Sequence, residues 1–401
     1  MSKNTQSFYD KDYCNKRNEL PYPKKEIKIH IMQILKDSIG KDLSHFCTPV
    51  YLNEPLSMLQ RLTENYQYSH LLNRAAKEQN QYIRISLIGA FGLSAFAFNQ
   101  YRTLKSFNPI LGETYEFIDN DQNMRIYCEQ VSHHPPISAC FAEGDGFNIY
   151  SNTHAETKFM LLKGCIEFAP VGKTFVNLLN FGETYSFTKP RVSVKNLIFG
   201  RMRLECYGKL EVVNKKTGDI LNMEMFEEST KHAHGSLSGE VKNIQGEVFL
   251  KIEGNCFDKV DIIHVNKSGE DLKRETIWNV VDEENSQSEQ SYFFTKFMCN
   301  LNNLNDDLKI LLPPTDSRFR PDQRALEEQN IELAEEEKKH LEKKQREARK
   351  LRERNNVKYE PMYFKEEFDN ITGELIFIKS GDYWKDRKEK NFLKFKDIFG
   401  R

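Results

Sequence analysis

Residues 125–136 read Arg-Ile-Tyr-Cys-Glu-Gln-Val-Ser-His-His-Pro-Pro. The first seven residues favour a β-strand, because β-branched and aromatic side chains are enriched in strands. Pro135 restricts His134 to an extended conformation, and Pro136 has a fixed φ and no N–H donor. A buried imidazole needs a polar partner. Two adjacent histidines held rigidly by the prolines are therefore unfavourable in a hydrophobic core. When protonated they offer N–H donors to an anion. Two solvent-facing histidines at a strand end are the alternative, and spacing alone does not separate the two.

The composition limits the class of protein. The 401 residues carry a net charge of −1 and contain no linker or low-complexity stretch. A single core of this size can bury a large apolar interior. Whole-molecule attraction to nucleic acid or to an anionic membrane is not indicated, so we expect phosphate recognition to be local and no nucleic-acid partner.

The cysteines and apolar runs indicate a cytoplasmic protein. The eight cysteines show no CxxC pairing, and the first residues contain no apolar signal core, which favours reduced thiols. The longest apolar run, residues 87–98, is shorter than the roughly 20 residues that span a bilayer. We therefore expect a buried helix there, and membrane contact that is peripheral and transient.

The first part of the chain is predicted to be helical. Ile27, Ile31, Ile34 and Leu35 repeat at positions i, i+4, i+7 and i+8, which is one apolar face of a helix. Further helices are predicted over about residues 55–76 and 81–100. A charged helix is predicted over about 322–354, with Pro321 suited to its start.

From about residue 112 the hydrophobic period changes to two. Residues 204–213 alternate apolar and polar side chains, as in a half-buried strand. Turn signals recur for about 170 residues with no predicted helix between them, which indicates an antiparallel meander. A sheet this long must curl or close, so the pattern predicts a large β-barrel or sandwich, and a barrel of this size leaves room for a ligand.

Five ordered segments resemble one known family. They are residues 129–136 (EQVSHHPP), Leu52-Asn-Glu-Pro-Leu-Ser-Met-Leu-Gln-Arg-Leu62, Lys105-Ser-Phe-Asn-Pro-Ile-Leu-Gly-Glu-Thr114, Pro314-Thr-Asp-Ser-Arg-Phe-Arg-Pro-Asp-Gln-Arg324, and Glu337-Lys338 through Gln345-Arg346. Together they resemble the lipid-transfer proteins related to oxysterol-binding protein, in their short, single-domain form. The resemblance runs from about residue 20 to the C-terminus.

The resemblance implies an α+β, mainly β fold. An incomplete antiparallel β-barrel would enclose an apolar tunnel, with an N-terminal helical lid region and a C-terminal helical subdomain. We expect a single lipid-binding domain over 1–401, divided at about 20–50 (lid and approach), 51–105 (helical), 106–300 (barrel) and 301–401 (C-terminal subdomain). The lid would carry Ile27, Ile31, Ile34 and Leu35.

One row on the late charged helix stands out. Lys338, Glu342 and Arg346 share a helix face, and that face borders an apolar stripe of Ala334, Leu341 and Ala348 that would anchor the helix. The resemblance implies that this row contacts an inositol-phosphate headgroup, with Glu342 ordering the two cations. It adds His133 and His134, together with Lys105 and Asn108 from a loop in which Ser106 replaces the usual proline and should loosen the loop.

The charge count favours one ligand. A phosphomonoester carries about −1.5 to −2, and a phosphodiester adds about one more charge. Lys105, Lys338 and Arg346 offset about three charges, which suits phosphatidylinositol 4-phosphate. The predicted function is exchange of this lipid for a sterol between membranes. The alternatives are exchange for phosphatidylserine and a lipid-sensing role.

Two other classes of protein fit the sequence less well. A hydrolase or metal enzyme would use Cys128, His133, His134 and Cys140, but their spacing matches no common zinc site, and Pro135 and Pro136 should splay the chain away from Cys140. A partner-binding coiled coil at 322–354 would have polar residues at alternate seam positions. We therefore expect no catalytic residues, no metal and no cofactor, and a monomer whose partners are membrane lipids.

Overall fold

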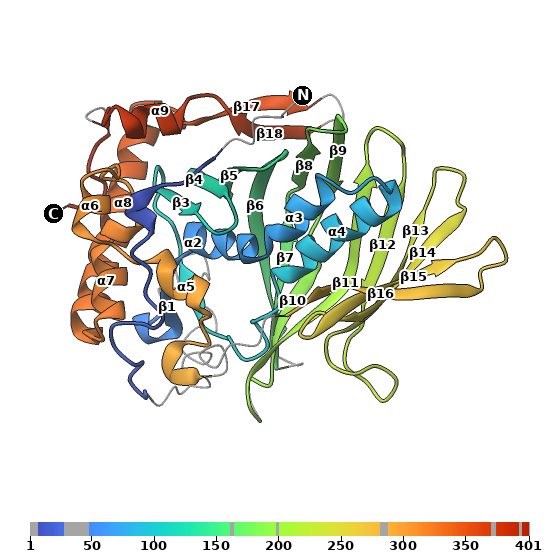
Figure 1. Ribbon diagram of the computed structural model, residues 1–401. Coiled ribbons are helices and arrows are strands. Elements are labelled where there is room, and N and C mark those ends of the chain that lie inside the picture. Colours follow the sequence, from blue (N-terminus) through green and yellow to red (C-terminus); the bar gives the residue numbers. More distant parts are fainter. Residues whose placement is uncertain are drawn as a thin grey trace.

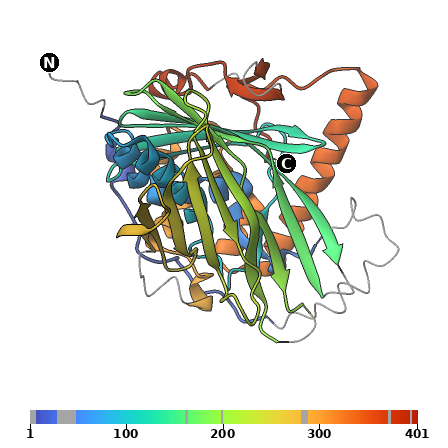
Figure 2. The same cartoon turned by 90° about the vertical axis from the view of Figure 1, so that its right-hand side faces the viewer.

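The computed structural model describes residues 7–27, 48–160, 164–197, 200–280, 288–369, 374–392 and 395–400. Within these residues the main element is an antiparallel sheet of fourteen strands, which curls around the middle of the molecule (Figures 1 and 2). Its strands are β3 (Thr114–Asp119), β4 (Met124–His133), β5 (Pro136–Gly144), β6 (Phe147–Met160), β7 (Cys165–Val171), β8 (Thr174–Leu178), β9 (Glu183–Phe187), β10 (Arg191–Lys195), β11 (Arg203–Asn214), β12 (Ile220–Met225), β13 (Ser236–Lys242), β14 (Val248–Asn255), β15 (Lys259–Val265) and β16 (Asp271–Asn279).

The barrel is incomplete. The strand order runs from β16 through consecutive neighbours to β10, then to β7 and on to β3, while β8 and β9 form a side path between β6 and β11. The end strands β3 and β16 do not pair with each other in this order. The predicted large, partly closed antiparallel barrel is therefore confirmed. The period-two pattern is confirmed on β11, where Leu204, Cys206, Leu210 and Val212 are buried.

Helix α4 (Gln81–Ser94) packs against the sheet, as Figure 1 shows. It contacts β11, β12, β13, β14 and β16. Two glycines allow the close approach: a Cβ at Gly89 would lie within 2.3 Å of Leu221, and one at Gly92 within 3.1 Å of Leu210. Eleven of its residues are buried, so the apolar run is a buried helix, as predicted. It ends at Ser94, earlier than expected, and turns follow.

The segment before α4 is more broken than predicted. Strand β1 (Asn53–Ser57) pairs in parallel with β2 (Lys105–Phe107), outside the large sheet. Ser57 and Gln60 form a capping box that begins α2 (Met58–Thr63), because each side chain satisfies an unpaired backbone N–H at the helix start. The 3-10 helix η4 (Glu64–Tyr68) and α3 (His70–Ala75) follow.

The late charged segment forms two helices where one was predicted. Pro321 starts α7 (Pro321–Glu327), as expected, but α8 covers Ile331–Arg354. Between them Gln329 has a φ of 60°, and the side chain of Asn330 caps α8 by accepting from the N–H of Leu333. A residue in the left-handed region cannot continue an α-helix, so the chain turns there.

Smaller elements complete the described part. They are the 3-10 helices η1 (Lys11–Tyr13), η3 (Val50–Leu52), η7 (Glu289–Ser291) and η8 (Ser317–Phe319), the helices α5 (Lys296–Leu301), α6 (Asp306–Lys309) and α9 (Tyr383–Lys388), and the strands β17 (Phe364–Asp369) and β18 (Glu374–Lys379). Strand β18 contacts β5 and β6. The chain after α8 therefore packs back onto the barrel.

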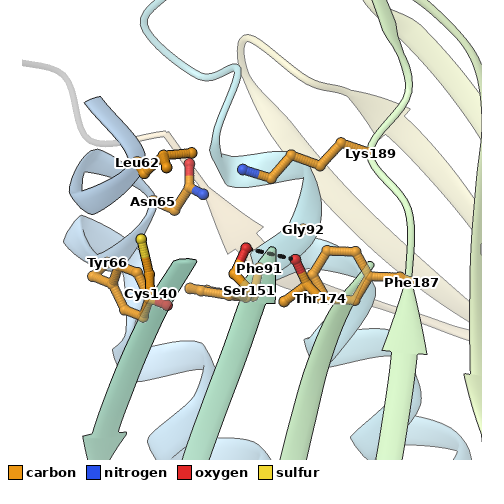
Figure 3. A pocket seen from close by; sticks show the side chains of 10 residues that line it. All are labelled: Leu62, Asn65, Tyr66, Phe91, Gly92, Cys140, Ser151, Thr174, Phe187 and Lys189. Atoms are coloured by element: carbon orange, nitrogen blue, oxygen red, sulfur yellow. Dashed lines mark hydrogen bonds between the residues drawn. The ribbon is translucent and has the colours of Figure 1, made fainter. Parts of the chain in front are cut away.

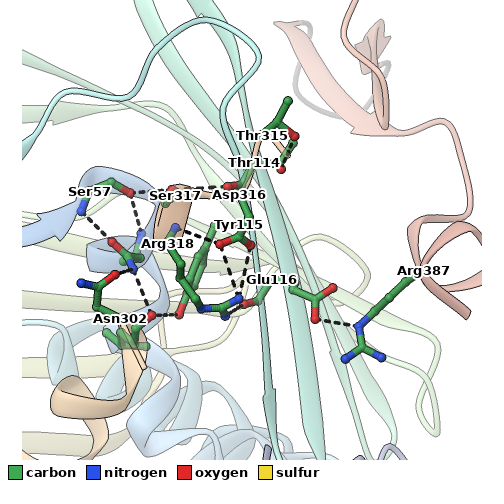
Figure 4. A network of polar contacts seen from close by, with 12 residues as sticks. Ser57, Thr114, Tyr115, Glu116, Asn302, Thr315, Asp316, Ser317, Arg318 and Arg387 are labelled. Atoms are coloured by element: carbon green, nitrogen blue, oxygen red, sulfur yellow. Dashed lines mark hydrogen bonds and ion pairs between the residues drawn. The ribbon is translucent and has the colours of Figure 1, made fainter. Parts of the chain in front are cut away.

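A buried polar network joins the C-terminal part to β3 (Figure 4). Arg318 is fully buried and pairs with Asp316 at 3.3 Å, and it also donates to the carbonyl of Glu116. The carboxylate of Glu116 accepts from Tyr383 and Arg387, both at 2.7 Å. These contacts fix both η8 and α9 against β3, at the edge of the sheet.

Replacing Asp316 with alanine should cost about 3–5 kcal/mol of unfolding free energy, because it leaves the Arg318 guanidinium buried without its carboxylate. Urea unfolding followed by circular dichroism measures this change. The control is Asp307→Ala on the exposed surface of α6, which should change stability by less than about 0.5 kcal/mol. Equal stability of the two variants would contradict the role given to the network.

Candidate anion-binding site and inner cavity

His133 and His134 lie at the turn between β4 and β5. His133 is the cross-strand partner of Pro136, so the two prolines lie at the turn of the hairpin. The expectation that they splay the chain away from Cys140 is wrong, because Cys140 pairs directly with Cys128 across the hairpin. Four rungs of roughly 3.3 Å separate this pair of cysteines from the histidines.

The two histidines differ in their surroundings. His134 is exposed, and its Nε2 lies 2.6 Å from a guanidinium nitrogen of Arg349 on α8. The Nδ1 of His133 is buried and has no hydrogen-bond partner in the described part of the chain. Loss of water contact, followed by the nearby charges of His134, Arg349 and Arg352, lowers the pKa of His133 to about 4. His133 is therefore neutral at pH 7 in the free protein.

The predicted row on α8 is in place. The Nζ of Lys338 donates to the carbonyl of Thr48 at 2.7 Å and to Glu342 at 2.9 Å. The other oxygen of Glu342 lies 4.0 Å from Arg346. Glu342 therefore lies between the two cations and bonds to Lys338; that it orders both cations stays a prediction. Lys338 is buried, whereas the side chain of Arg346 is 59% exposed.

The apolar stripe of α8 anchors the helix. Ala334 belongs to a cluster with Val50 and Phe107, and Leu341 packs with Ile110 and Phe399. The face that a coiled coil would use is thus occupied by the protein itself. Figure 2 shows α8 running along one side of the molecule beside the sheet.

Strand β2, which begins at Lys105, and the loop after it, which contains Asn108, lie along the same helix. Phe107 packs near Ala334 of α8, and Ile110 packs near Leu341. Lys338 lies between these two contact points on the helix. The loop is not loosened by Ser106, contrary to expectation. Ser106 lies within β2, and its carbonyl accepts from the side chain of Asn53 at 3.1 Å.

Two residues of this face were missed in the sequence. Arg349 touches His134, and the amide nitrogen of Gln345 is buried with no partner among the described residues. At about 100° per residue, positions 338, 342, 345 and 349 lie within roughly 60° of one another. A search of the sequence for polar residues spaced i, i+4, i+7 and i+11 from Lys338 would have identified both Gln345 and Arg349. Arg346 lies at the edge of this face, and the structure gives it no contact with the histidines.

The face is long compared with one phosphate group. Lys338 and Arg349 are eleven residues apart, which is about 16 Å along the helix axis. A single phosphate cannot bridge that distance, but a ligand with two separated anionic groups can use both ends. One end is formed by Lys338 and the loop of Lys105, and the other by Arg349 and the two histidines.

Most of the predicted lid lies outside the described residues. This applies to Ile31, Ile34 and Leu35, while Ile27 is the last described residue before the gap and is 37% exposed. The chain leading to it is anchored to the C-terminal part: Arg17 pairs with Glu327, and the N–H of Lys25 donates to Gln329 at 2.8 Å.

An inner cavity lies between the helices and the sheet (Figure 3). The rings of Tyr66, Phe91 and Phe187 form its apolar wall. The polar side chains that line it are Asn65, Cys140, Ser151, Thr174 and Lys189.

The fold and the site place the chain in a class of proteins with a large curled antiparallel sheet that is packed against helices. The sequence model described as oxysterol-binding protein matches residues 30–388. The chain therefore belongs to the oxysterol-binding protein family.

Several relatives resemble this chain over almost its whole length. Oxysterol-binding protein-related protein 3 of Mus musculus is 36% identical over 384 residues, which are 94% of this chain and 43% of that protein. Oxysterol-binding protein-related protein 1B of Arabidopsis thaliana is 35% identical over 394 residues, which are 97% of this chain and 78% of that protein. The chain thus spans less than half of the mouse relative.

Solved structures confirm the fold. The Osh1 ORD domain in complex with cholesterol has a TM-score of 0.88 and 32% identity, covering 96% of this chain and 94% of that one. The Osh3 ORD of Saccharomyces cerevisiae in complex with PI(4)P has a TM-score of 0.81 and 30% identity, covering 96% and 99%. Among the helices that the structure describes, none combines the length and the apolar character needed to cross a membrane.

The low pKa of His133 can be measured directly. Titration of the imidazole signals by nuclear magnetic resonance should give a pKa of about 4 for His133. In the unfolded chain this pKa is about 6.5, so the unfolded state binds the proton first as the pH falls. The stability from neutral His133 is complete above about pH 6.5 and is lost as the pH falls toward about 4. A measured pKa at or above 6.5 would contradict the burial described here.

Proposed function

We propose that the protein is a lipid-transfer protein that carries phosphatidylinositol 4-phosphate and exchanges it for a sterol between membranes. The observation that supports this proposal most directly is the contact between Arg349 and His134. Beside it lies the Nδ1 atom of His133, which has no hydrogen-bond partner among the described residues. The contact between Arg349 and His134 brings the histidine motif and the basic helix together, although more than 200 residues separate them in the sequence.

The two phosphates of the headgroup lie on opposite sides of one inositol ring, so they are closer together than the two ends of the α8 face, and the long side chains of Lys338 and Arg349 would converge on them. The phosphomonoester would lie at the end formed by His133, His134 and Arg349, with Arg346 within reach from the edge of the face. The linking phosphodiester would lie near Lys338 and Lys105, with Asn108 and Glu342 bonding the ring hydroxyls. Hydrogen bonds between cations and phosphate are about twice as strong as hydrogen bonds between neutral groups. A small number of such contacts is therefore enough to bind the headgroup.

A phosphate beside His133 would raise the pKa of that residue. Opposite charge favours the protonated imidazole, and in the protonated imidazole both ring nitrogens are donors, the partnerless Nδ1 included. The site is thus neutral at His133 when empty and gains a positive charge when the phosphate enters. Binding would be coupled to proton uptake.

The lipid tails explain why a barrel is needed. Each methylene exposed to water costs about 0.8 kcal/mol, so two bare acyl chains would cost on the order of 20 kcal/mol or more. We propose that the curled sheet encloses them while the lipid is carried. Related structures support both ligands, since the Osh1 domain holds cholesterol and the Osh3 domain holds PI(4)P.

Exchange follows when the two lipids compete for one interior. Only one would fit at a time, so a gradient of phosphatidylinositol 4-phosphate could drive the sterol in the other direction. Such a protein would touch organelle membranes transiently and act as a monomer. Phosphatidylserine in place of the sterol, or lipid sensing without bulk transfer, remain the alternatives.

The histidine pair gives the direct test. The double variant His133→Ala/His134→Ala should lose at least ~10-fold of its transfer of phosphatidylinositol 4-phosphate between liposomes, because two donors to the phosphomonoester are removed. Sterol transfer by the same variant should be retained, which shows that the barrel is intact. Unchanged phosphoinositide transfer would defeat the site assignment.

Neighbouring lysines on α8 provide a matched pair. Lys338→Ala should weaken extraction of phosphatidylinositol 4-phosphate by about 10-fold or more, since it removes a charge-assisted donor. Lys339→Ala is the control, because Lys339 is exposed and pairs with Glu335. Extraction from liposomes that contain a labelled phosphoinositide measures both. If the two variants lose the same activity, the face assigned to Lys338 is wrong.

A further inference from the structure

The C-terminal end of α8 is the most basic part of the chain. Residues 343–358 contain eight lysine and arginine residues against two glutamates, a formal net charge of +6 in a chain whose total is −1. Figure 2 shows this end of the helix at an outer corner of the molecule. The charge of the protein is therefore distributed unevenly, and a concentrated positive region lies at the surface.

Part of this charge lies on a face that the proposed headgroup site does not use. At about 100° per residue, Lys343, Lys350 and Arg354 lie within roughly 40° of one another, and they point roughly 140° away from Lys338. All three are exposed. Lys343 lies 4.0 Å from Glu347, at the limit of an ion pair.

The other glutamate does not neutralise this face. Glu353 pairs with Arg349 at 2.9 Å, and Arg349 belongs to the headgroup face. Lys350 and Arg354 form no ion pair with any residue that the structure describes. They are four residues apart on the helix, so their like charges repel each other. An anionic surface placed against both would relieve this repulsion.

Two apolar side chains accompany these cations at the end of the helix. Asn356 has a φ of 51°, and the N–H groups of Asn356 and Val357 donate to the carbonyls of Glu353 and Arg352 at 3.2 and 3.0 Å. This is a Schellman motif, which turns the chain back onto the last turn of the helix. That turn contains Leu351, and the side chains of Leu351 and Val357 remain 60% and 58% exposed.

The same end of α8 adjoins the hairpin that carries the histidines. Arg349 lies 2.6 Å from His134, and Pro135 and Pro136 at the tip of the hairpin are exposed. Cations, aliphatic side chains and proline rings therefore occur together beside the candidate headgroup site.

An anionic membrane matches this combination of groups. Lysine and arginine are attracted to the negative surface potential of anionic lipids, and aliphatic side chains leave water when they enter the boundary between headgroups and acyl chains. A nucleic acid would balance the cations but would offer no apolar surface to the leucine and the valine. The pairing of both kinds of group favours the membrane.

We propose that the C-terminal end of α8 docks the protein on anionic membranes, with Lys343, Lys350 and Arg354 against the lipid headgroups and Leu351 and Val357 inserted among them. The inference rests on the proposed function in one respect, because docking at this end would bring the histidines to the membrane from which a phosphoinositide is taken. Docking itself needs only an anionic lipid such as phosphatidylserine.

Vesicle binding tests the docking face. The vesicles consist of phosphatidylcholine, with or without phosphatidylserine, and contain no phosphoinositide that could engage the headgroup site. The wild type should sediment with the anionic vesicles at least ~10-fold more strongly than with the neutral ones, because several cations contribute. Added salt should reduce this difference by screening the charges.

Two variants separate the charged and the apolar contributions. Lys343→Gln/Lys350→Gln/Arg354→Gln should weaken binding to the anionic vesicles by about 10-fold or more. Leu351→Ser/Val357→Ser should weaken it by about 5-fold or more, because less apolar surface leaves water. Both variants should keep the circular dichroism spectrum of the wild type, since the substituted side chains are exposed.

The matched controls change the same kinds of residue elsewhere. Lys209→Gln/Lys267→Gln/Lys273→Gln removes three exposed cations, and Leu179→Ser/Leu272→Ser removes two leucines that are 58% and 66% exposed. Both controls should bind the anionic vesicles as the wild type does. Equal losses in the controls and in the α8 variants would overturn the proposal.

Three other results would also contradict it. The wild type could bind neither kind of vesicle, or bind both equally. Alternatively, the glutamine variant could lose binding while the serine variant keeps it in full, which would indicate charge attraction without insertion and point to a nucleic acid or an acidic protein as the partner.

Extraction of phosphatidylinositol 4-phosphate by the same proteins distinguishes this inference from the proposed function. A wild type that docks through the end of α8 but extracts no phosphoinositide would defeat the proposed function and leave the docking face in place. A wild type that extracts the phosphoinositide while the α8 variants bind anionic vesicles normally would defeat this inference alone.

Discussion

The buried guanidinium of Arg320 holds the candidate headgroup site together. It donates to the carboxylate of Glu113 at 2.9 Å, to the carbonyl of Asn108 at 2.8 Å and to Asp322 at 2.8 Å. Arg320 immediately precedes α7, so one side chain joins the loop of Lys105 and Asn108, the start of β3 and the helical pair α7–α8. A buried ion pair adds little net stability compared with apolar packing, but losing one partner is costly. Its main consequence here is geometric, because it fixes two distant segments side by side.

The parts of the fold that follow from local periodicity could be predicted. Alternation along residues 204–213 predicted a sheet, and the apolar run at 87–98 predicted a buried helix. The resemblance to a known family assigned the headgroup contact to the row of Lys338, Glu342 and Arg346, and helix geometry predicted that these residues share a face. The stripe of Ala334 and Leu341 was found for the same reason, and both residues pack where expected.

Features that depend on tertiary contacts could not be predicted. Gln329 breaks the late helix by adopting a positive φ, although glutamine is a good helix former. Cys128 and Cys140 meet because the prolines form the turn of a tight hairpin, a register that spacing did not reveal.

The most direct test of the central claim is a crystal structure of the protein with phosphatidylinositol 4-phosphate. The account predicts the phosphomonoester between the rings of His133 and His134 and the basic end of α8, with the acyl chains inside the barrel. A headgroup bound away from α8, or acyl chains lying outside the sheet, would contradict it.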